Sequence, residues 1–524
     1  MRGVGEIVQF NGMYYPDKRA IVDQEKEFTW REVNERINQL ANALTSLGCQ
    51  DGDRIAILAY NSSEYIECGF ATAKVGMVFV PLNFRLSLRE IEYILRDSAP
   101  KVFFFGKEFS DVADSLRLQF PLHYICIGEE VEGATEYEAL LESKATSEPS
   151  EKGITVDENS PSEILYTSGT TGLPKGVVHT HRARLAGVVT HVLYGGLKHD
   201  DIHLVNVPAL FHGAGHVWML ANAYVGASII ISRLRGFDPE VLLTTIQEES
   251  VTNLHLVPTT ILQLLEFPSV GKYDVSSLRV IYYATAPMPV SLLRRALNIF
   301  GNIFVQPYGL TEAGPTVTVL GRKEHDMSGL SDEEANRRLR SCGRPFWGRF
   351  VKVVDDRGEE VSPHEVGEII VKSTDVMDCY WNNEEETKKV LKDGWLYTGD
   401  LATYDENLYL YLVDRKKDMI ISGGENIYPA EIERVLWDHP AVAECAVIGV
   451  PDDKWGEAVK ALVVQRTGHR VDEEEIIQFC KEFLASYKKP KSVEFVSELP
   501  RNPQGKILKR VLREKYWAGK ERKI

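Results

Sequence analysis

Short apolar runs alternate with longer amphipathic stretches through the first part of the chain. This order is typical of βαβ units, in which parallel strands are connected by helices that cover the sheet. The strands are expected at 54–59, 77–81, 101–105, 228–232, 255–257, 279–283 and 302–305, and one helix is expected at 63–76. The predicted fold class is therefore α/β, with parallel sheets in a large N-terminal domain.

The pattern changes twice towards the C-terminus. Between 350 and 411 shorter strands and turns predict a small β subdomain, and the last part of the chain reads as a compact α+β unit. Strands are expected at 351–355, 367–371, 408–412, 445–449 and 459–464, and a helix at 430–437. We place the domain boundary so that an N-terminal domain at 1–415 precedes a C-terminal domain at 416–524.

A further helix is predicted after Asp472, which is a good N-cap residue. Apolar residues then recur at Ile476, Cys480, Phe483 and Tyr487, which would share one face of that helix. We expect this face to pack on the sheet of the α+β unit.

Composition narrows the function classes. A chain of 524 residues is too long for one hydrophobic core, and 44% hydrophobic with 26% charged residues is typical of a soluble globular protein. The net charge of −16 argues against nucleic acid as the main partner. The segment 506–524 is basic, so contact with an anionic membrane surface stays open beside a solvated helix. No apolar window is long enough for a transmembrane span.

The seven cysteines are dispersed, without metal-ligand spacing. Such a set is typical of reduced thiols, which predicts a cytoplasmic protein.

The segment 166–177, YTSGTTGLPKGV, concentrates glycine, hydroxyl side chains and one lysine. Its glycines let backbone N–H groups approach an anion closely, and Lys175 adds a point charge. An apolar strand precedes it, and 177–189 is expected to lead into a helix, so the loop would join a strand to a helix N-terminus. It is not a Walker A loop, because a proline precedes the lysine. We predict a phosphate-binding loop.

The order of residues in this loop resembles the signature of the adenylate-forming superfamily. Acyl- and aryl-CoA synthetases, peptide-synthetase adenylation domains and beetle luciferases belong to it. Further segments resemble the motifs of that family and follow in the same order. They are YGLTE at 308–312, WLYTGD at 395–400, DRKKD at 414–418, SGGENIYP at 422–429 and PRNPQGK at 500–506.

The resemblance implies a large N-terminal domain, a small mobile C-terminal domain and an AMP-forming acid:CoA ligase that uses ATP, Mg²⁺ and coenzyme A. It implies that Lys506 bridges the carboxylate and the α-phosphate, and that Glu312 holds Mg²⁺ while Thr311 donates to a phosphate. Lys417 takes the hinge position. The implied ATP-binding residues are Thr167, Ser168, Gly169, Thr170, Thr171, Gly172, Lys175, Ala286, Pro287, Tyr308, Gly309, Thr311, Asp400 and Arg415.

The resemblance also implies where CoA and the acid bind. Ser422, Gly423 and Gly424 would line the pantetheine passage. Trp455, Tyr487, Lys489 and Lys491 would hold the CoA nucleotide, with a solvated basic turn as the alternative. The acyl pocket would be bordered by Phe211, His212, Gly213, Ala214 and Gly215, whose small residues are expected to leave space, with His212 beside the carboxylate.

Two departures from the family pattern affect the adenine side. Many relatives have Gly-Gly where this chain has Ala284-Thr285, and many have Gly where it has Pro307. Both exchanges restrict the backbone. They remove no catalytic group.

Several hypotheses about the substrate remain open. A medium- or long-chain fatty acid is the first expectation and an aryl or cyclic acid the second. Transfer to a carrier protein and a catalytically silent binding protein are the alternatives. The expected partners are a small carboxylic acid, ATP and CoA, with peripheral membrane contact and a homodimer left open.

Overall fold

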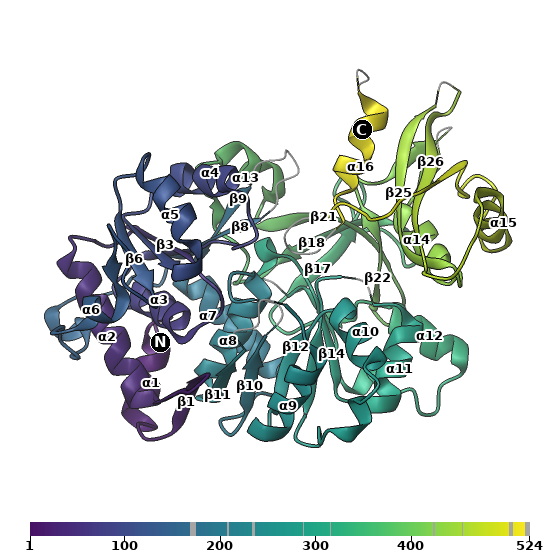
Figure 1. Cartoon of the computed structure of the whole chain (residues 1–524). Helices are drawn as coiled ribbons and strands as arrows, with labels where there is room; N and C mark the ends of the chain where they lie inside the picture. Colours follow the sequence, from purple (N-terminus) through teal and green to yellow (C-terminus); the bar gives the residue numbers. More distant parts are fainter. Residues whose placement is uncertain are drawn as a thin grey trace. The chain divides into compact units, whose positions relative to one another are not determined.

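A computed structural model describes residues 1–167, 174–206, 209–232, 236–286, 288–314, 316–422, 425–452, 454–501 and 507–518. The chain divides into two compact units (Figure 1). The first unit comprises Met1–Phe350 and Val371–Leu396, and the second comprises Val351–Ile370 and Tyr397–Ile524. The segment 351–370 thus groups with the C-terminal part, while the boundary at 415 stays a prediction.

A nine-stranded mixed sheet forms one half of the first unit, in the order β16-β15-β14-β13-β12-β10-β11-β1-β2. Its six central strands, from β14 to β1, are parallel, and the strands at the two edges are antiparallel. The strands are β1 Arg19–Asp23, β2 Lys26–Thr29, β10 Ile202–Val205, β11 Ser228–Ile231, β12 Asn253–Leu256, β13 Val280–Tyr283, β14 Phe304–Tyr308, β15 Thr318–Leu320 and β16 Arg344–Pro345.

A second sheet of eight strands has the order β19-β9-β8-β4-β3-β5-β6-β7. Strands β8 to β7 are parallel, whereas β9 and β19 add antiparallel strands at one edge. The strands are β3 Arg54–Leu58, β4 Val78–Pro81, β5 Val102–Gly106, β6 His123–Ile127, β7 Thr135–Glu136, β8 Pro161–Thr167, β9 Lys175–Thr180 and β19 Cys379–Tyr380.

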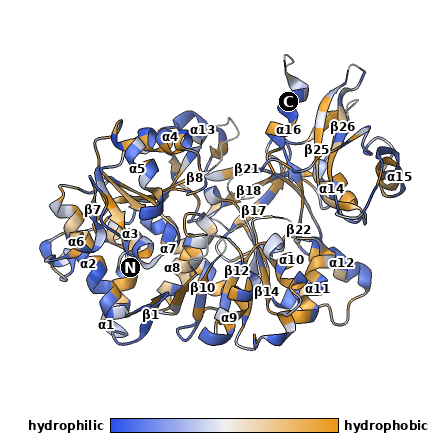
Figure 2. Ribbon diagram, viewed as in Figure 1, coloured by the Kyte–Doolittle hydropathy of each residue, from blue (hydrophilic) through white to orange (hydrophobic). Residues whose placement is uncertain are grey.

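Helices cover both sheets of the first unit, with their hydrophilic faces outward (Figure 2). One core cluster joins α2, α3 and α8 to the inner strand faces, and another packs α9, α10 and α11 on the opposite face of the nine-stranded sheet. The helices are α1 Glu6–Tyr14, α2 Trp30–Ser46, α3 Ser63–Lys74, α4 Leu88–Ser98, α5 Ser110–Arg117, α6 Tyr137–Leu141, α7 His181–Gly195, α8 Gly213–Tyr224, α9 Pro239–Glu249, α10 Pro258–Glu266, α11 Val290–Phe300, α12 Asp332–Arg340 and α13 Glu384–Val390. Short 3₁₀ turns are η1 Lys107–Phe109, η2 Pro149–Lys152, η3 Val270–Lys272, η4 Thr311–Ala313 and η5 Lys323–His325.

Two further sheets occupy the later part of the chain. One has the order β17-β18-β21-β20, with β22 beside β21, and the other has the order β24-β23-β26-β25, with β27 beside β26. Their strands are β17 Phe350–Val354, β18 Gly367–Lys372, β20 Leu391–Lys392, β21 Trp395–Tyr404, β22 Leu410–Arg415, β23 Ile420–Ser422, β24 Glu425–Ile427, β25 Val442–Asp452, β26 Gly456–Gln465 and β27 Ser492–Phe495. The helices of the second unit are α14 Pro429–Trp437, α15 Glu473–Phe483 and α16 Lys509–Trp517.

Two sequence-based expectations about elements were wrong. The stretch after the phosphate loop is not the start of a helix: β9 runs antiparallel to β8 from Lys175 to Thr180, and α7 begins only at His181. Val177 and Val178 are β-branched and fully paired in the sheet, which explains the strand. The loop therefore closes a hairpin instead of preceding a helix N-terminus.

The helix after Asp472 begins as predicted, with a capping box between Asp472 and Glu475. It ends at Phe483, however, so the apolar face is shorter than expected. Ile476 and Cys480 are fully buried, whereas Phe483 is 63% exposed and Tyr487 lies beyond the helix.

All seven cysteines are free, and Cys379 alone among them is not buried. Within the described ranges, no helix combines the length and the hydropathy that crossing a membrane would need.

Candidate active site

The predicted phosphate loop begins and ends at the β8–β9 hairpin. Thr167 at the end of β8 pairs with Lys175 at the start of β9. Ser168, Gly169, Thr170, Thr171 and Gly172 lie outside the described residues. Because the loop leads into β9, a bound anion would be held by the loop's own N–H groups and Lys175, without a helix N-terminus.

The Lys175 ammonium is held between two side chains of the segment that follows β18. It forms an ion pair with Glu386 of α13, and it lies 5.1 Å from the ring centroid of Tyr380. The hydrogen bonds from Lys175 and Lys389 lower the pKa of the Glu386 carboxyl. Lys175 therefore has a fixed position and a partner anion.

Thr311 and Glu312 lie in the short turn η4, which follows β14. The Tyr380 hydroxyl donates to Glu312 Oε1 at 2.9 Å, and the Met377 N–H donates to the Glu312 carbonyl at 2.9 Å. His179 on β9 contacts the Thr311 carbonyl through Nε2 at 2.9 Å. Burial lowers the pKa of His179, so the imidazole is neutral and donates this bond. The structure thus brings Lys175 and Glu312 into contact with one residue, Tyr380.

A buried ion pair lies next to the chain that follows η4. Arg349 pairs with Asp375, and both side chains are at most 3% exposed. Gly314, at φ +77°, packs so closely on Asp375 that a Cβ would lie 2.2 Å from the Asp375 carbonyl oxygen. Arg349 also donates to the Thr316 carbonyl and, at 3.0 Å, to Thr190 Oγ1. The chain that follows η4 is therefore held by residues far away in the sequence.

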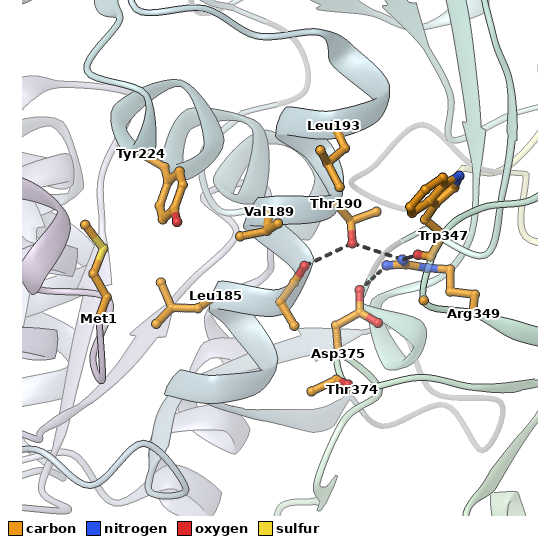
Figure 3. A pocket seen from close by; sticks show the side chains of 12 residues that line it. Met1, Leu185, Val189, Thr190, Leu193, Tyr224, Trp347, Arg349, Thr374 and Asp375 are labelled. Carbon is orange, nitrogen blue, oxygen red and sulfur yellow. Dashed lines mark hydrogen bonds and ion pairs between the residues drawn. The ribbon is translucent and has the colours of Figure 1, made fainter.

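A cavity of about 460 Å³ opens on the outer side of α7, with Arg349 and Asp375 at one end (Figure 3). Its other walls are largely apolar side chains of Met1, Leu185, Val189, Leu193, Tyr224 and Trp347. None of the described residues that are predicted to bind ATP, CoA or the acid lines it. We therefore assign the cavity no part in the active site.

His212 caps the N-terminus of α8, since the Ala214 N–H donates to its Nδ1 at 3.2 Å. Burial lowers the pKa of His212 to about 4, so the ring is neutral at physiological pH. A Cβ on Gly213 would lie 3.3 Å from Leu165 Cδ1 and 3.6 Å from Thr311 Oγ1. The start of α8 is therefore next to Thr311, and the space beside Gly213, which was expected to be open, is already filled.

A second histidine lies near His212 on the inner face of β12. His255 is 3% exposed, and neither ring nitrogen has a hydrogen-bond partner among the described residues. Burial and the neighbouring His212, His203 and His191 lower the pKa of His255 well below its usual value. Trp218 of α8 faces it edge to face, with the ring centroids 6.3 Å apart.

The adenine-side residues of the first unit follow β13 and β14. Tyr308 is the last residue of β14, and Gly309 and Ala286 are exposed. Pro287 lies outside the described residues. Thr285, at a position where many relatives have glycine, has φ +73°, a left-handed conformation that β-branched residues rarely adopt. The departure noted in the sequence thus places strain in the backbone.

In the second unit, Asp400 on β21 pairs with Arg415 on β22, with Arg415 Nε 3.1 Å from Asp400 Oδ1. Burial and then the neighbouring Arg415 lower the pKa of the Lys417 ammonium, and Asp418 beside it accepts from Arg513 at 2.8 Å. The predicted ribose ligand and hinge residues are therefore close together in the fold of this unit.

The expected CoA residues are only partly brought together. Ser422 pairs with Gly456, next to Trp455, and Lys491 Nζ lies 5.1 Å from the Trp455 ring centroid. Tyr487 contacts Lys488 instead, at 5.8 Å, and Lys489 is half-buried. Gly423, Gly424 and Lys506 lie outside the described residues.

Comparisons with known proteins identify the family. The family model described as AMP-binding enzyme matches residues 9–381, and the one for the AMP-binding enzyme C-terminal domain matches 431–506. The chain belongs to the AMP-binding enzymes. It is an enzyme of the adenylate-forming superfamily, in the branch of the AMP-forming acyl-CoA synthetases.

Three relatives show the range of this family. A fatty acid–[acyl-carrier-protein] ligase, ScoC of Streptomyces coeruleorubidus, is 35% identical over 99% of this chain and 97% of its own. A feruloyl-CoA synthase of an Amycolatopsis species is 38% identical over 96% of each chain. The structure of a Mycobacterium tuberculosis fatty acyl CoA synthetase is 36% identical over 99% of each chain, with a TM-score of 0.77. The names of these proteins include two acyl acceptors, an acyl-carrier protein and CoA, and two kinds of acid, fatty and feruloyl.

Sequence reasoning missed Tyr380, Glu386, His179 and His255. Tyr380 and Glu386 follow a motif-poor segment, and their contacts with Glu312 and Lys175 span 68 and 211 positions. The pairing of β19 with β9 brings these residues together, and no local sequence pattern predicts that pairing. The row of histidines on α7, β10, α8 and β12 was the one signal present in the sequence.

Proposed function

We propose that this protein is an ATP-dependent acid:CoA ligase. The carboxylate attacks the α-phosphorus of ATP to give acyl-AMP and pyrophosphate, and the CoA thiolate then displaces AMP to give the thioester. The observation that carries the proposal is the contact of Lys175 and Glu312 with one side chain, Tyr380, at the edge of the sheet that bears the phosphate loop.

Each residue has a proposed role. Lys175 and the loop N–H groups hold the phosphates, Asp400 accepts the ribose hydroxyls, and Lys506 stabilises the charge that develops when the two anions meet. The neutral His212 lies near Thr311 and can donate a hydrogen bond from Nε2 to the carboxylate, because its Nδ1 accepts from the backbone. Trp455 and Lys491, which lie side by side in the second unit, would bind the adenine and phosphates of CoA.

Glu312 fits a magnesium ligand. Its hard carboxylate oxygens suit the ion, and Mg²⁺ in nucleotide sites is typically held by one or two carboxylates together with phosphates and water. Among the described residues no group of three or more His, Cys, Asp or Glu side chains could hold a metal ion. Bound Mg²⁺ would neutralise phosphate charge.

A medium- or long-chain fatty acid is the first candidate for the substrate, and an aryl acid is the second. One observation favours the second candidate. Neither ring nitrogen of His255 has a hydrogen-bond partner in the part of the chain that the structure describes. His255 lies on the inner sheet face with the rings of Trp218 and Tyr282, close enough to His212 for that residue to lower its pKa. A flat acid with a hydroxyl group would satisfy this imidazole, whereas a plain alkyl chain would leave it unpaired. We place the reaction in the cytoplasm, given the free cysteines.

One experiment tests the function. Purified protein is incubated with ATP, Mg²⁺ and CoA and with matched acids: octanoate, palmitate, cinnamate and 4-hydroxycinnamate. AMP release and thioester mass are measured. We expect AMP and thioester in equal amounts with at least one acid. Acyl-AMP without thioester would favour transfer to a carrier protein, and no adenylate with any acid would contradict the ligase assignment for these acids.

A further inference from the structure

Tyr380 lies on β19, the edge strand that pairs antiparallel with β9, where it is opposite Val177. Its side chain is buried, with 7% exposed. The hydroxyl donates to Glu312 Oε1 at 2.9 Å, and the ring centroid lies 5.1 Å from Lys175 Nζ. One side chain therefore contacts both charged residues that are proposed to meet the ATP phosphates.

The backbone around Tyr380 has little freedom. The N–H groups of Asp378 and Trp381 donate to the carbonyls of Val178 and Gly176 on β9, at 2.9 and 2.7 Å. The Tyr380 N–H donates to Thr387 Oγ1 at 2.9 Å. The first two bonds attach the segment to β9, the strand that follows the phosphate loop, and the third attaches it to α13.

The same segment is attached to the turn that carries Glu312. The Met377 N–H donates to the Glu312 carbonyl at 2.9 Å, so the backbone and the side chain of Glu312 are both held by one stretch of five residues. A movement of the carboxylate relative to Lys175 would have to break either these bonds or the pairing of β19 with β9.

Charge explains why such a link matters. Lys175 and Glu312 have opposite charges, yet Lys175 forms its ion pair with Glu386, on α13. The ring face of Tyr380 contacts the Lys175 ammonium, and its hydroxyl donates a hydrogen bond to the Glu312 carboxylate. Tyr380 therefore holds both charged groups without bringing them into direct contact. Phosphates bound by Lys175 and a cation bound by Glu312 need such a defined separation.

We propose that Tyr380 is a positioning residue that sets the geometry of Lys175 and Glu312 for the metal–nucleotide complex. This inference rests on the proposed function. The hydroxyl orients the Glu312 carboxylate, and the ring orients the Lys175 ammonium, so the two contributions are separable by substitution.

The test compares Tyr380→Phe with Tyr380→Leu. Phenylalanine keeps the ring beside Lys175 and removes the bond to Glu312, whereas leucine removes both. ATP binding is measured by calorimetry with and without Mg²⁺, on full-length protein without acid or CoA. Loss of a hydrogen bond to a metal ligand typically weakens metal binding ~10-fold or more. We therefore expect Tyr380→Phe to weaken ATP binding about tenfold with Mg²⁺ and to leave binding without Mg²⁺ unchanged.

Tyr380→Leu is expected to weaken ATP binding under both conditions. Tyr137→Phe is the matched control, because it removes a hydroxyl bond to another glutamate, Glu67, at 2.6 Å outside the site. It should change the melting temperature but neither affinity. Wild-type affinity of Tyr380→Phe with Mg²⁺, or an equal loss with and without Mg²⁺, would overturn the role of the hydroxyl. A wild-type protein that binds no ATP would overturn the proposed function as well.

Discussion

The two units hold their expected functional residues in different ways. In the first unit, Lys175, Glu312 and His212 are themselves partly buried, and each has a partner within the fold. In the second unit, Trp455 and Tyr487 are 43% and 46% exposed, and their lysine neighbours Lys491 and Lys488 pair with acidic residues at the surface.

This difference separates two kinds of site. Residues proposed to act in adenylation are positioned by packing, so a change at a distance can disturb them. The residues proposed to bind CoA form a surface cluster, and changes there should stay local. Four predictions test the contrast, from the largest expected effect to the smallest.

Acid should destabilise the first unit far more than the second. Burial lowers the pKa of His181, His203, His212 and His325 to about 4 and of His191 and His216 to about 3, and all six lie in the first unit. A folded pKa below the unfolded value of ~6.5 means that the unfolded chain binds more protons, so stability falls as pH falls from about 6.5 towards 4.

At pH 5.5 each such histidine would cost ~1 kcal/mol, and the group several kcal/mol. In the second unit, burial lowers the pKa of the His439 imidazole, but that side chain is only partly buried. Full-length protein is incubated at pH 7.5 or 5.5 and then pulse-labelled with deuterium at one common pH. Peptides of the first unit should lose protection at pH 5.5 while those of the second keep it. Equal loss in both would remove this contrast.

Lys506→Ala tests whether each unit serves a single half-reaction, adenylation or thioester formation. This residue belongs to the second unit by sequence but is expected to stabilise charge in adenylation. We expect the adenylation rate to fall ~10²-fold or more. Thioester formation from preformed acyl-AMP should be largely retained. Single-turnover measurements of both half-reactions check this, and an equal loss in both would contradict separate roles.

Reversing the charge of Lys489 and Lys491 together should affect only CoA. Each charge-assisted contact is typically worth ~1.5–3 kcal/mol, so we expect the KM for CoA to rise about tenfold. Adenylation, and transfer to pantetheine, which lacks the nucleotide, should stay unchanged. Charge reversal at Lys272 and Lys323, two exposed lysines of the first unit, is the control. If the double variant has the wild-type KM for CoA, the two lysines are solvated surface residues that do not bind CoA.

Thr285→Gly should give the smallest effect. Glycine adopts φ +73° without the steric cost of a β-branched residue, and relief of such strain is worth ~1–3 kcal/mol, partly offset by the ~0.5–1 kcal/mol that glycine costs in unfolded-chain entropy. We expect a stabilisation of ~1 kcal/mol by urea unfolding and an altered KM for ATP. Ser250→Gly, at φ +52° after α9, should stabilise without changing that KM.

Much of the fold could be predicted from local patterns. The runs at 54–59, 77–81, 101–105 and 228–232 are strands because apolar residues buried on both faces leave a continuous signal. The signal failed for β9, where the apolar stretch leads directly into α7, and for α15, where Phe483 continues the helical spacing beyond the last residue that meets the core.

The candidate site, like the fold, could be predicted only where the signal is local in the sequence. Motifs located Lys175 and Glu312, because their residue types and spacing are local. Tyr380 and Asp375 could not be found, because their importance comes from β19 joining the sheet and from Gly314 packing on a distant backbone. The boundary at 415, the mobility of the second unit and the roles of the loop residues remain predictions.

The half-exposed Cys379 immediately precedes Tyr380 on the edge strand, while the other six thiols are buried. Burial raises the pKa of its thiol to about 11, so it should alkylate slowly at neutral pH. The chain thus contains its own chemical reporter. The rate at which a maleimide labels this one sulfur would follow any loosening of the strand that holds Glu312, without a dye, a tag or an acid to turn over.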